Sequence, residues 1–169
     1  MGEELIWKRL YEVRELSNCL KTKTAAALVK DGIILSVGPN SCAPEGYNYG
    51  DKIERCPREN VPTGIGYELC KPVHAEVMAP LNIRPNRSLD EIGRYASHLL
   101  PQVSDQYFLD AFVPEELEKI HGSKLYLLGH YWACDTCKRF TSLIGVADII
   151  FNKFSADQVL KRYSENKIT

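Results

Sequence analysis

A predicted β-hairpin near the start of the chain does most to constrain the fold. Two short apolar runs, Thr24 to Lys30 and Ile33 to Gly38, are separated only by Asp31-Gly32. An Asp-Gly pair between two such runs is the strongest short-range signal for a two-residue hairpin turn. We therefore expect these runs to be neighbouring antiparallel strands, in a chain whose 169 residues suit a single domain spanning residues 1–169.

Segments with helical spacing flank the hairpin and then alternate with further apolar runs. The spacing predicts helices over residues 3–19, 88–100, 114–121, 136–146 and 155–163, and strands over residues 124–129 and 147–151. A turn or two of helix is also expected from His74 to Ala79, where Pro80 would stop it. Alternation of helices and strands makes the later strands parallel and places helices on both faces of the sheet. The pattern therefore predicts an α/β fold with a mixed sheet.

The charge balance and the first residues exclude several classes of partner. With 21 Lys and Arg against 22 Asp and Glu, the net charge is -1, so no overall basic field would attract nucleic acid or an anionic membrane. The N-terminal residues are acidic where a secretory signal would be basic, and no apolar run approaches the ~20 residues that span a bilayer. We expect a cytoplasmic protein with neither a stable nucleic-acid partner nor a membrane partner.

Two short motifs carry the chemistry. Each of them, His74-Ala75-Glu76 and Cys134-Asp135-Thr136-Cys137, is weak alone, because either can occur by chance. Together, one imidazole and two thiolates supply three of the four tetrahedral ligands that zinc takes, and an open fourth position is typical of a catalytic site. The start of a helix at Cys134 would also stabilise the thiolates through the helix dipole.

Glu76 is the candidate acid–base group. It lies two residues from the expected ligand His74, so its carboxylate can take a proton from a water and deliver it to a leaving amine. Zinc lowers the pKa of a bound water to about 7, which supplies hydroxide at neutral pH. A structural zinc site has no use for such an acid, so the combination indicates hydrolytic deamination.

These residues resemble the zinc-dependent cytidine and deoxycytidylate deaminases, whose signature is His-x-Glu followed by Pro-Cys-x-x-Cys. The likeness covers residues 5–79 and 120–163. It includes Val29-Lys30-Asp31-Gly32 and Gly38-Pro39-Asn40 around the hairpin, and Cys56-Pro57-Arg58, Pro62-Thr63-Gly64 and Glu68-Leu69-Cys70 in the long loop that follows. Within the family, the segments are most similar to those of deoxycytidylate deaminases.

The resemblance implies a role for each matching residue. It implies zinc ligation by His74, Cys134 and Cys137, a proton shuttle at Glu76, a backbone N–H donated by Ala75 to the pyrimidine carbonyl, and a sugar contact from Asn40. It also implies a three-layer α/β/α sandwich with a mixed sheet of four to five strands, and assembly into a homo-oligomer. The implied reaction converts a cytosine nucleotide, most simply dCMP to dUMP, with release of ammonia.

The sequence also departs from the family pattern. Ala133 replaces the proline before Cys134, which changes the pocket wall without removing a ligand. Residues 81–120 are longer than the segment the family usually carries there, and we expect a helical insertion. The chain ends at Thr169, where relatives often have a fifth strand, so that strand is expected to be missing or very short.

Other interpretations stay open at this stage. The same chemistry could act on a free nucleoside, a free base or a modified pyrimidine. An inactive zinc- or nucleotide-binding regulatory module is also open, and it would have a closed site in which Cys70, Cys42 or His130 supplies the fourth ligand. Cys56, Cys70, Cys19 and Cys42 could bind a second, structural zinc, or they could be free buried thiols. Five basic residues near the motifs could bind a phosphate or could be ordinary surface charge: Lys21, Lys23, Arg55, Arg58 and Lys71.

Overall fold

A four-stranded mixed sheet forms the centre of the protein, which we describe from a computed structural model covering residues 2–62 and 64–166. The strands are β1 (Ala25–Lys30), β2 (Ile33–Pro39), β3 (Lys124–Leu128) and β4 (Asp148–Phe151), in the spatial order β2-β1-β3-β4. β1 is antiparallel to both β2 and β3, and β3 is parallel to β4. The expected mixed sheet is confirmed with four strands; the segment at residues 167–169, where a fifth strand was considered, lies outside the described residues.

The predicted hairpin is confirmed. Asp31 and Gly32 have φ values of 52° and 73°, which is the pair of positive values that a type I′ turn requires. Lys30 is paired with Ile33 directly across the turn. This turn sets the register of the pairs next to it, and an irregularity between Leu28 and Val29 shifts the register of the rest of β2 by one residue.

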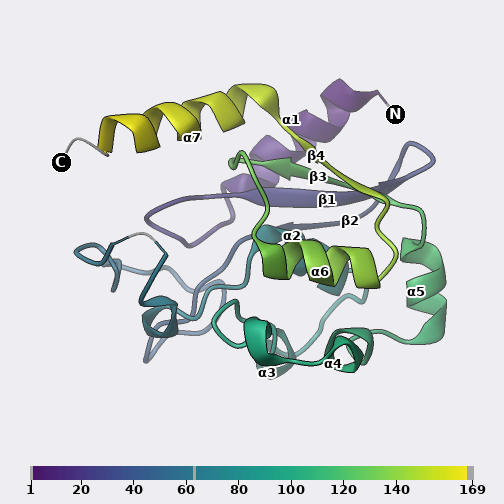
Figure 1. The fold of residues 1–169 in the computed structure, drawn as a ribbon, viewed down its shortest axis with the longest axis horizontal. Helices are drawn as coiled ribbons and strands as arrows, with labels where there is room; N and C mark the ends of the chain where they lie inside the picture. The colour runs from purple at the N-terminus through teal and green to yellow at the C-terminus, as the bar shows by residue number, and fades with distance from the viewer. Residues whose placement is uncertain (1, 63, 167–169) are drawn as a thin grey trace.

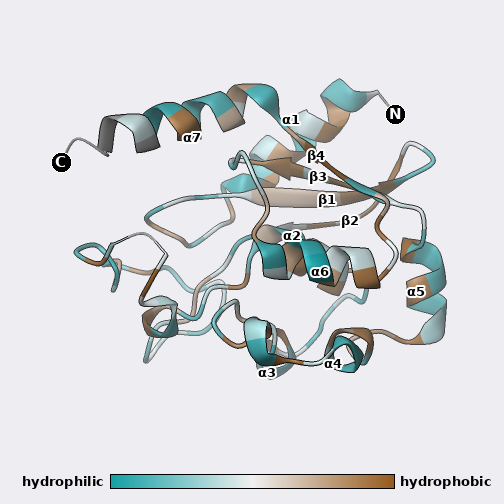
Figure 2. Ribbon diagram, in the orientation of Figure 1, coloured by the Kyte–Doolittle hydropathy of each residue, from teal (hydrophilic) through white to brown (hydrophobic). Residues whose placement is uncertain are grey.

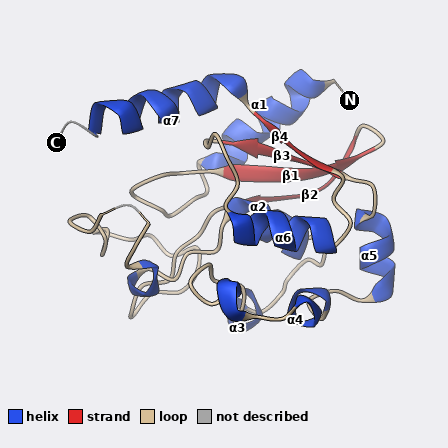
Figure 3. Cartoon of the chain, viewed as in Figure 1, coloured by secondary structure: helices blue, strands red, loops and turns tan. Residues whose placement is uncertain are grey.

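Helices cover both faces of the sheet, so the predicted three-layer α/β/α arrangement is confirmed. α1 (Glu3–Arg14) and α7 (Lys153–Asn166) lie on one face, and α2 (Ala75–Leu81) and α6 (Asp135–Leu143) lie on the other (Figures 1 and 3). β1 is buried on both faces, and the strands form the most continuous hydrophobic region of the ribbon (Figure 2). Alternate residues of β1 therefore join two separate cores, one with α1 and one with α2 and α6.

Residues 82–120, most of the segment 81–120 for which a helical insertion was expected, contain several short helices and lie beneath α2 and α6. It contains α3 (Leu89–Gly93), a 3-10 turn (Leu100–Gln102), α4 (Asp105–Leu109) and α5 (Pro114–Ile120). The aromatic rings of Phe108 and Phe112 pack against Phe140 of α6, with ring centroids 5.4 and 6.1 Å apart. The insertion therefore supports the helix that follows the Cys-x-x-Cys motif (Figure 1).

Two of the predicted helices end well before their expected residues. α1 ends at Arg14 instead of residue 19, since Ser17 and Asn18 turn inward and hydrogen-bond to Asn40 and to the Cys42 carbonyl. α3 begins as predicted, with the Ser88 hydroxyl accepting from the Glu91 N–H, but it ends at Gly93. Beyond it the chain turns so that the Ser97 N–H donates to the Pro72 carbonyl, at 2.7 Å.

Other boundaries also differ from the prediction. α2 continues through Pro80 to Leu81, so the proline does not stop it; placed next to last, Pro80 costs the helix a single N–H near its end. α7 begins at Lys153, before the predicted residue 155, because the Asn152 side chain caps it by accepting from the Ser155 N–H. α4 was not predicted. Within the described residues, no helix is both long enough and apolar enough to span a bilayer.

Candidate metal centre

The two motifs meet at the starts of two helices. His74 is the N-cap of α2, and Cys134 is the N-cap of α6, where its sulfur accepts from the Cys137 N–H at 3.4 Å. His74 is brought there because Val73 pairs with Ser41 in an isolated antiparallel bridge just beyond β2. Both helices therefore begin at the same end of the sheet.

The three predicted ligands form one compact cluster. The Cys134 and Cys137 sulfurs are 3.1 Å apart, and the His74 Nδ1 lies 3.3 Å from Cys137 Sγ and 3.8 Å from Cys134 Sγ. Tetrahedral zinc with Zn–S of about 2.3 Å and Zn–N of about 2.0–2.1 Å would hold such atoms about 3.6–3.8 Å apart. A small opening of the thiol pair therefore accommodates zinc, and we conclude that the cluster can hold one metal ion.

Within the described residues, no fourth His, Cys, Asp or Glu donor joins the cluster. Among the described residues, these three form the only group of at least three His, Cys, Asp or Glu ligand atoms that all lie within 4.8 Å of one another. The described residues therefore do not form the closed site in which Cys42, Cys70 or His130 would be the fourth ligand. A three-ligand protein site leaves one tetrahedral position for a water or a substrate.

The thiols are arranged so that one of them ionises easily. Hydrogen bonding from Cys137 and from His74 lowers the pKa of Cys134 to about 4, against the opposing effect of burial. The same Cys134–Cys137 interaction, together with burial, raises the pKa of Cys137. Burial by itself would lower the pKa of His74, but its hydrogen bond to Cys134 and the charge of Glu76 raise it overall. Before metal binds, the cluster therefore already favours a thiolate.

Glu76 lies beside the cluster in the first turn of α2. Its side chain is 6% exposed, and burial raises the pKa of its carboxyl, although the charge of His74 opposes that rise. A carboxylate with a raised pKa accepts a proton more readily than an exposed glutamate does. The position and environment of Glu76 therefore suit an acid–base group.

The two residues expected to contact substrate have different surroundings. Ala75 is the first residue of α2, so its N–H is one of those a helix leaves without an internal partner. The Asn40 side chain is engaged within the protein: its Oδ1 accepts from the Ser17 hydroxyl and the Thr24 N–H, and its Nδ2 donates to the Thr22 carbonyl. Asn40 therefore orders the segment before β1, and its sugar contact stays a prediction.

The cysteines considered for a second zinc are only partly brought together. Cys19, Cys42 and Cys70 share a small cluster with Ile53 and Tyr67, whereas Cys56 lies outside it. Interaction with Cys42 is the largest influence on the pKa of Cys19, which it lowers to about 6, and it also lowers the pKa of Cys70. Their sulfurs do not meet the 4.8 Å spacing found for His74, Cys134 and Cys137 in the described chain, so the structure gives no support to a second zinc.

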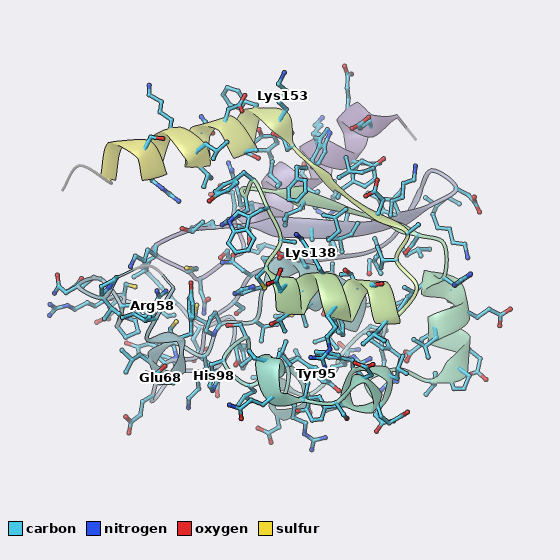
Figure 4. All side chains as sticks on the ribbon, in the orientation of Figure 1. Arg58, Glu68, Tyr95, His98, Lys138 and Lys153 are labelled. Carbon is cyan, nitrogen blue, oxygen red and sulfur yellow. The ribbon has the colours of Figure 1, made fainter. Side chains whose placement is uncertain are left out.

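Most of the basic residues near the motifs are already engaged. Lys21 donates to the carbonyls of Arg58 and Val61, and Arg55 pairs with Glu59. Arg58 is buried in the lobe formed by the long loop (Figure 4), where its guanidinium lies 4.0 Å from the centre of the Tyr67 ring. Lys23 differs from these residues, because it lines a cavity just before the start of β1.

Sequence reasoning missed two features around the cluster. The Tyr67 ring packs edge-on against His74 with ring centroids 6.4 Å apart, although nothing in the sequence around Tyr67 points to that contact. The second feature is an aromatic turn before Cys134, in which the His130 Nδ1 accepts the N–H groups of Tyr131 and Trp132. The His130 and Tyr131 rings stack at 5.0 Å, and Trp132 remains 45% exposed. This turn lies directly before Ala133 and Cys134 in the chain.

Comparisons with known proteins give a limited result. No protein-family model matches the chain, and no curated protein matches it. Among solved structures, the dCMP deaminase of the cyanophage S-TIM5 in its apo form is similar, with 20% identity over 95% of this chain and 94% of that chain, and a TM-score of 0.48. The same cyanophage enzyme in complex with dCMP and dUMP gives 21% identity over 92% of this chain and 88% of that chain, and a TM-score of 0.45.

Proposed function

We propose that this protein is a zinc-dependent hydrolytic deaminase that acts on a cytosine nucleotide, dCMP being the best candidate. One observation carries the proposal: a buried carboxyl, Glu76, lies beside a His–Cys–Cys cluster that has no fourth protein ligand among the described residues. A purely structural zinc site would be closed and would need no acid. The substrate class itself comes from the motif resemblance described above.

In the proposed reaction His74, Cys134 and Cys137 hold the zinc, which when bound would lower the pKa of a water molecule and so supply the nucleophile. The Ala75 N–H donates to the O2 carbonyl of the pyrimidine and orients the ring. Glu76 takes one proton of the attacking water and passes it to N3 of the ring. It then takes the remaining proton from the hydroxyl added at C4 and gives it to the amine, so that the C4–N bond breaks, ammonia leaves and the C4 carbonyl forms.

The first test separates the proposed chemistry from a merely structural zinc. Glu76→Gln keeps the size and most of the polarity of the side chain but removes the proton carrier. We expect it to retain zinc and to lose deamination by a factor of about 100 or more. Glu68→Gln is the matched control, because Glu68 is an exposed acid in the long loop that precedes α2 (Figure 4).

The assay measures ammonia release from dCMP, CMP, deoxycytidine and cytosine by the zinc-loaded protein, with the zinc content determined for each variant. Full activity in Glu76→Gln would remove the role given to Glu76. Absence of ammonia from all four compounds with the wild-type protein would refute the proposed function. Metal analysis is expected to give one zinc per chain, and two per chain would restore the second site at Cys19, Cys42 and Cys70.

A further inference from the structure

A second feature lies on the opposite face of the sheet from the metal cluster. A cavity of ≈ 400 Å³ is lined by the end of α1, the segment before β1, Gly129 at the end of β3, and α7. Its volume falls within the roughly 300–1,000 Å³ of small-molecule sites. It opens at the same end of the sheet at which α2 and α6 begin.

The cavity gathers positive charge in a chain that is almost neutral overall. Arg14, Lys23 and Arg162 line it, and Glu15 is the only acid among its lining residues. The three cations come from three different elements, so no local sequence pattern accounts for their meeting. Three cations against one acid give the lining a formal net charge of +2, which favours an anionic ligand.

The segment that carries Lys23 is held in place on both sides. Asn40 accepts from the Thr24 N–H at 2.9 Å and donates to the Thr22 carbonyl at 2.8 Å. The backbone of Gly129 lies so close that an added Cβ would come within 2.6 Å of the Lys23 carbonyl oxygen, and only glycine fits there. Lys23 therefore extends from a backbone that is already ordered, which reduces the entropy that ligand binding would cost.

Hydrogen bonds also order the lining residues Gly129, Ser155 and Arg162. The Gly129 N–H donates to the hydroxyl of Ser155, a residue of α7 that also lines the cavity, at 3.0 Å. Arg162 donates to the Thr22 hydroxyl at 3.2 Å, which brings the C-terminal helix to the segment before β1. An arginine in such a position can present a planar pair of donors, the arrangement that suits phosphate oxygens.

We propose that this cavity binds a phosphate group through Arg14, Lys23 and Arg162. Two sources share that chemistry: the 5′-phosphate of the nucleotide whose base lies at the metal cluster, or the phosphate of a separate small molecule. The first source rests on the proposed deaminase function, whereas phosphate binding as such does not. Gly129 and Cys134 are joined by a short turn, so the cavity and the cluster are connected through the segment at residues 129–134.

The test measures binding of inorganic phosphate to the zinc-loaded protein by calorimetry. Lys23→Gln and Arg162→Gln each remove one cation, and each should weaken phosphate binding by about tenfold or more, the usual effect of losing a charge-assisted hydrogen bond. Two variants are used because Arg162 also contacts Thr22. Lys153→Gln is the control, since Lys153 is an exposed lysine at the first residue of the same helix and does not line the cavity (Figure 4).

A second arm distinguishes the two sources through deamination of dCMP and of deoxycytidine. If the substrate's own phosphate is bound, both variants lower kcat/KM for dCMP but not for deoxycytidine, and inorganic phosphate competes with dCMP. If the ligand is a separate molecule, phosphate binding is lost in the variants while the ratio of the two kcat/KM values is unchanged. Wild-type protein that binds no phosphate, or that binds it as tightly in both variants as in Lys153→Gln, would overturn the proposal even if the protein proves to be an active deaminase.

Discussion

Gly38 in β2 provides the sharpest test of how the sheet positions the metal cluster. A Cβ added at Gly38 would lie 2.7 Å from the Ala79 backbone nitrogen and 2.8 Å from the Met78 carbonyl carbon. Both of these atoms belong to the backbone of α2, so a change of side-chain rotamer cannot relieve the clash. Gly38→Ala must therefore push α2 away from the sheet.

The size of the displacement and its cost follow from these distances. Ordinary contacts of a Cβ begin near 3.4 Å, so the helix must withdraw by about 0.7 Å at this point. Overpacking of this kind costs about 1–3 kcal/mol. In a chain of this size that cost corresponds to a fall in Tm of about 2–12 °C. Because α2 carries His74 at its N-cap, the shift also exceeds the ~0.2 Å tolerance of a zinc–ligand distance, and zinc affinity should fall.

The assay is thermal unfolding of the zinc-loaded and the zinc-free protein, combined with competition for zinc by a chelator. Gly2→Ala is the control, since a Cβ there meets nothing within 4 Å, and its cost as a helix N-cap should stay below about 1 kcal/mol. If Gly38→Ala unfolds within 1 °C of the wild type in both states and keeps its zinc affinity, close packing of β2 on α2 does not position the cluster.

Two further predictions concern stability. Arg87→Ala should lower the free energy of unfolding measured in urea by about 3 kcal/mol, because the 3% exposed Arg87 side chain donates to the Leu81 and Ala111 carbonyls and so joins α2 to the segment that follows it. Arg94→Ala is the control: Arg94 is exposed, and its loss should cost less than about 0.5 kcal/mol. Burial raises the pKa of Tyr49 to about 12, above the ~10 of an unfolded chain. The contribution of the neutral Tyr49 phenol to the free energy of unfolding is therefore lost as the pH rises from about 10 through 12. Tyr49→Phe should reduce this loss, and a slope of stability against pH that is unchanged in the variant would contradict the raised pKa of Tyr49.

Elements that depend on local signals were predicted well from the sequence. The Asp31-Gly32 turn, the four strands and the cap of α3 at Ser88 all rest on residues within a few positions of one another. The end of α1, which was predicted wrongly, depends on distant partners. α1 stops at Arg14 because Ser17 and Asn18 find hydrogen-bond partners in the segment after β2, and no periodicity within the helix could reveal those partners.

The candidate site was also predicted only in part: features that depend on local residue types were predicted, and features that depend on distant packing were not. The ligand set could be predicted because zinc coordination restricts the residue types, and the helix-start position of Cys134 followed from the pattern of α6. The cationic cavity could not be predicted, because Arg14, Lys23 and Arg162 meet only when α1, the segment before β1 and α7 pack together. The position of Asn40 at the turn after β2 could be read from the sequence, but its hydrogen bonds to the segment before β1 could not.

The meeting of His74 with two cysteines at least 60 residues away follows from the register of the sheet. Ala25, the first residue of β1, pairs with Pro39 at the end of β2 on one side and with Leu128 at the end of β3 on the other. The chain therefore leaves β2 and β3 at the same end of the sheet, and the Ser41–Val73 bridge returns it to that end before α2 begins. Because these pairings fix where both helices start, the positions of His74, Cys134 and Cys137 do not depend on the lengths of the segments at residues 42–72 and 82–120.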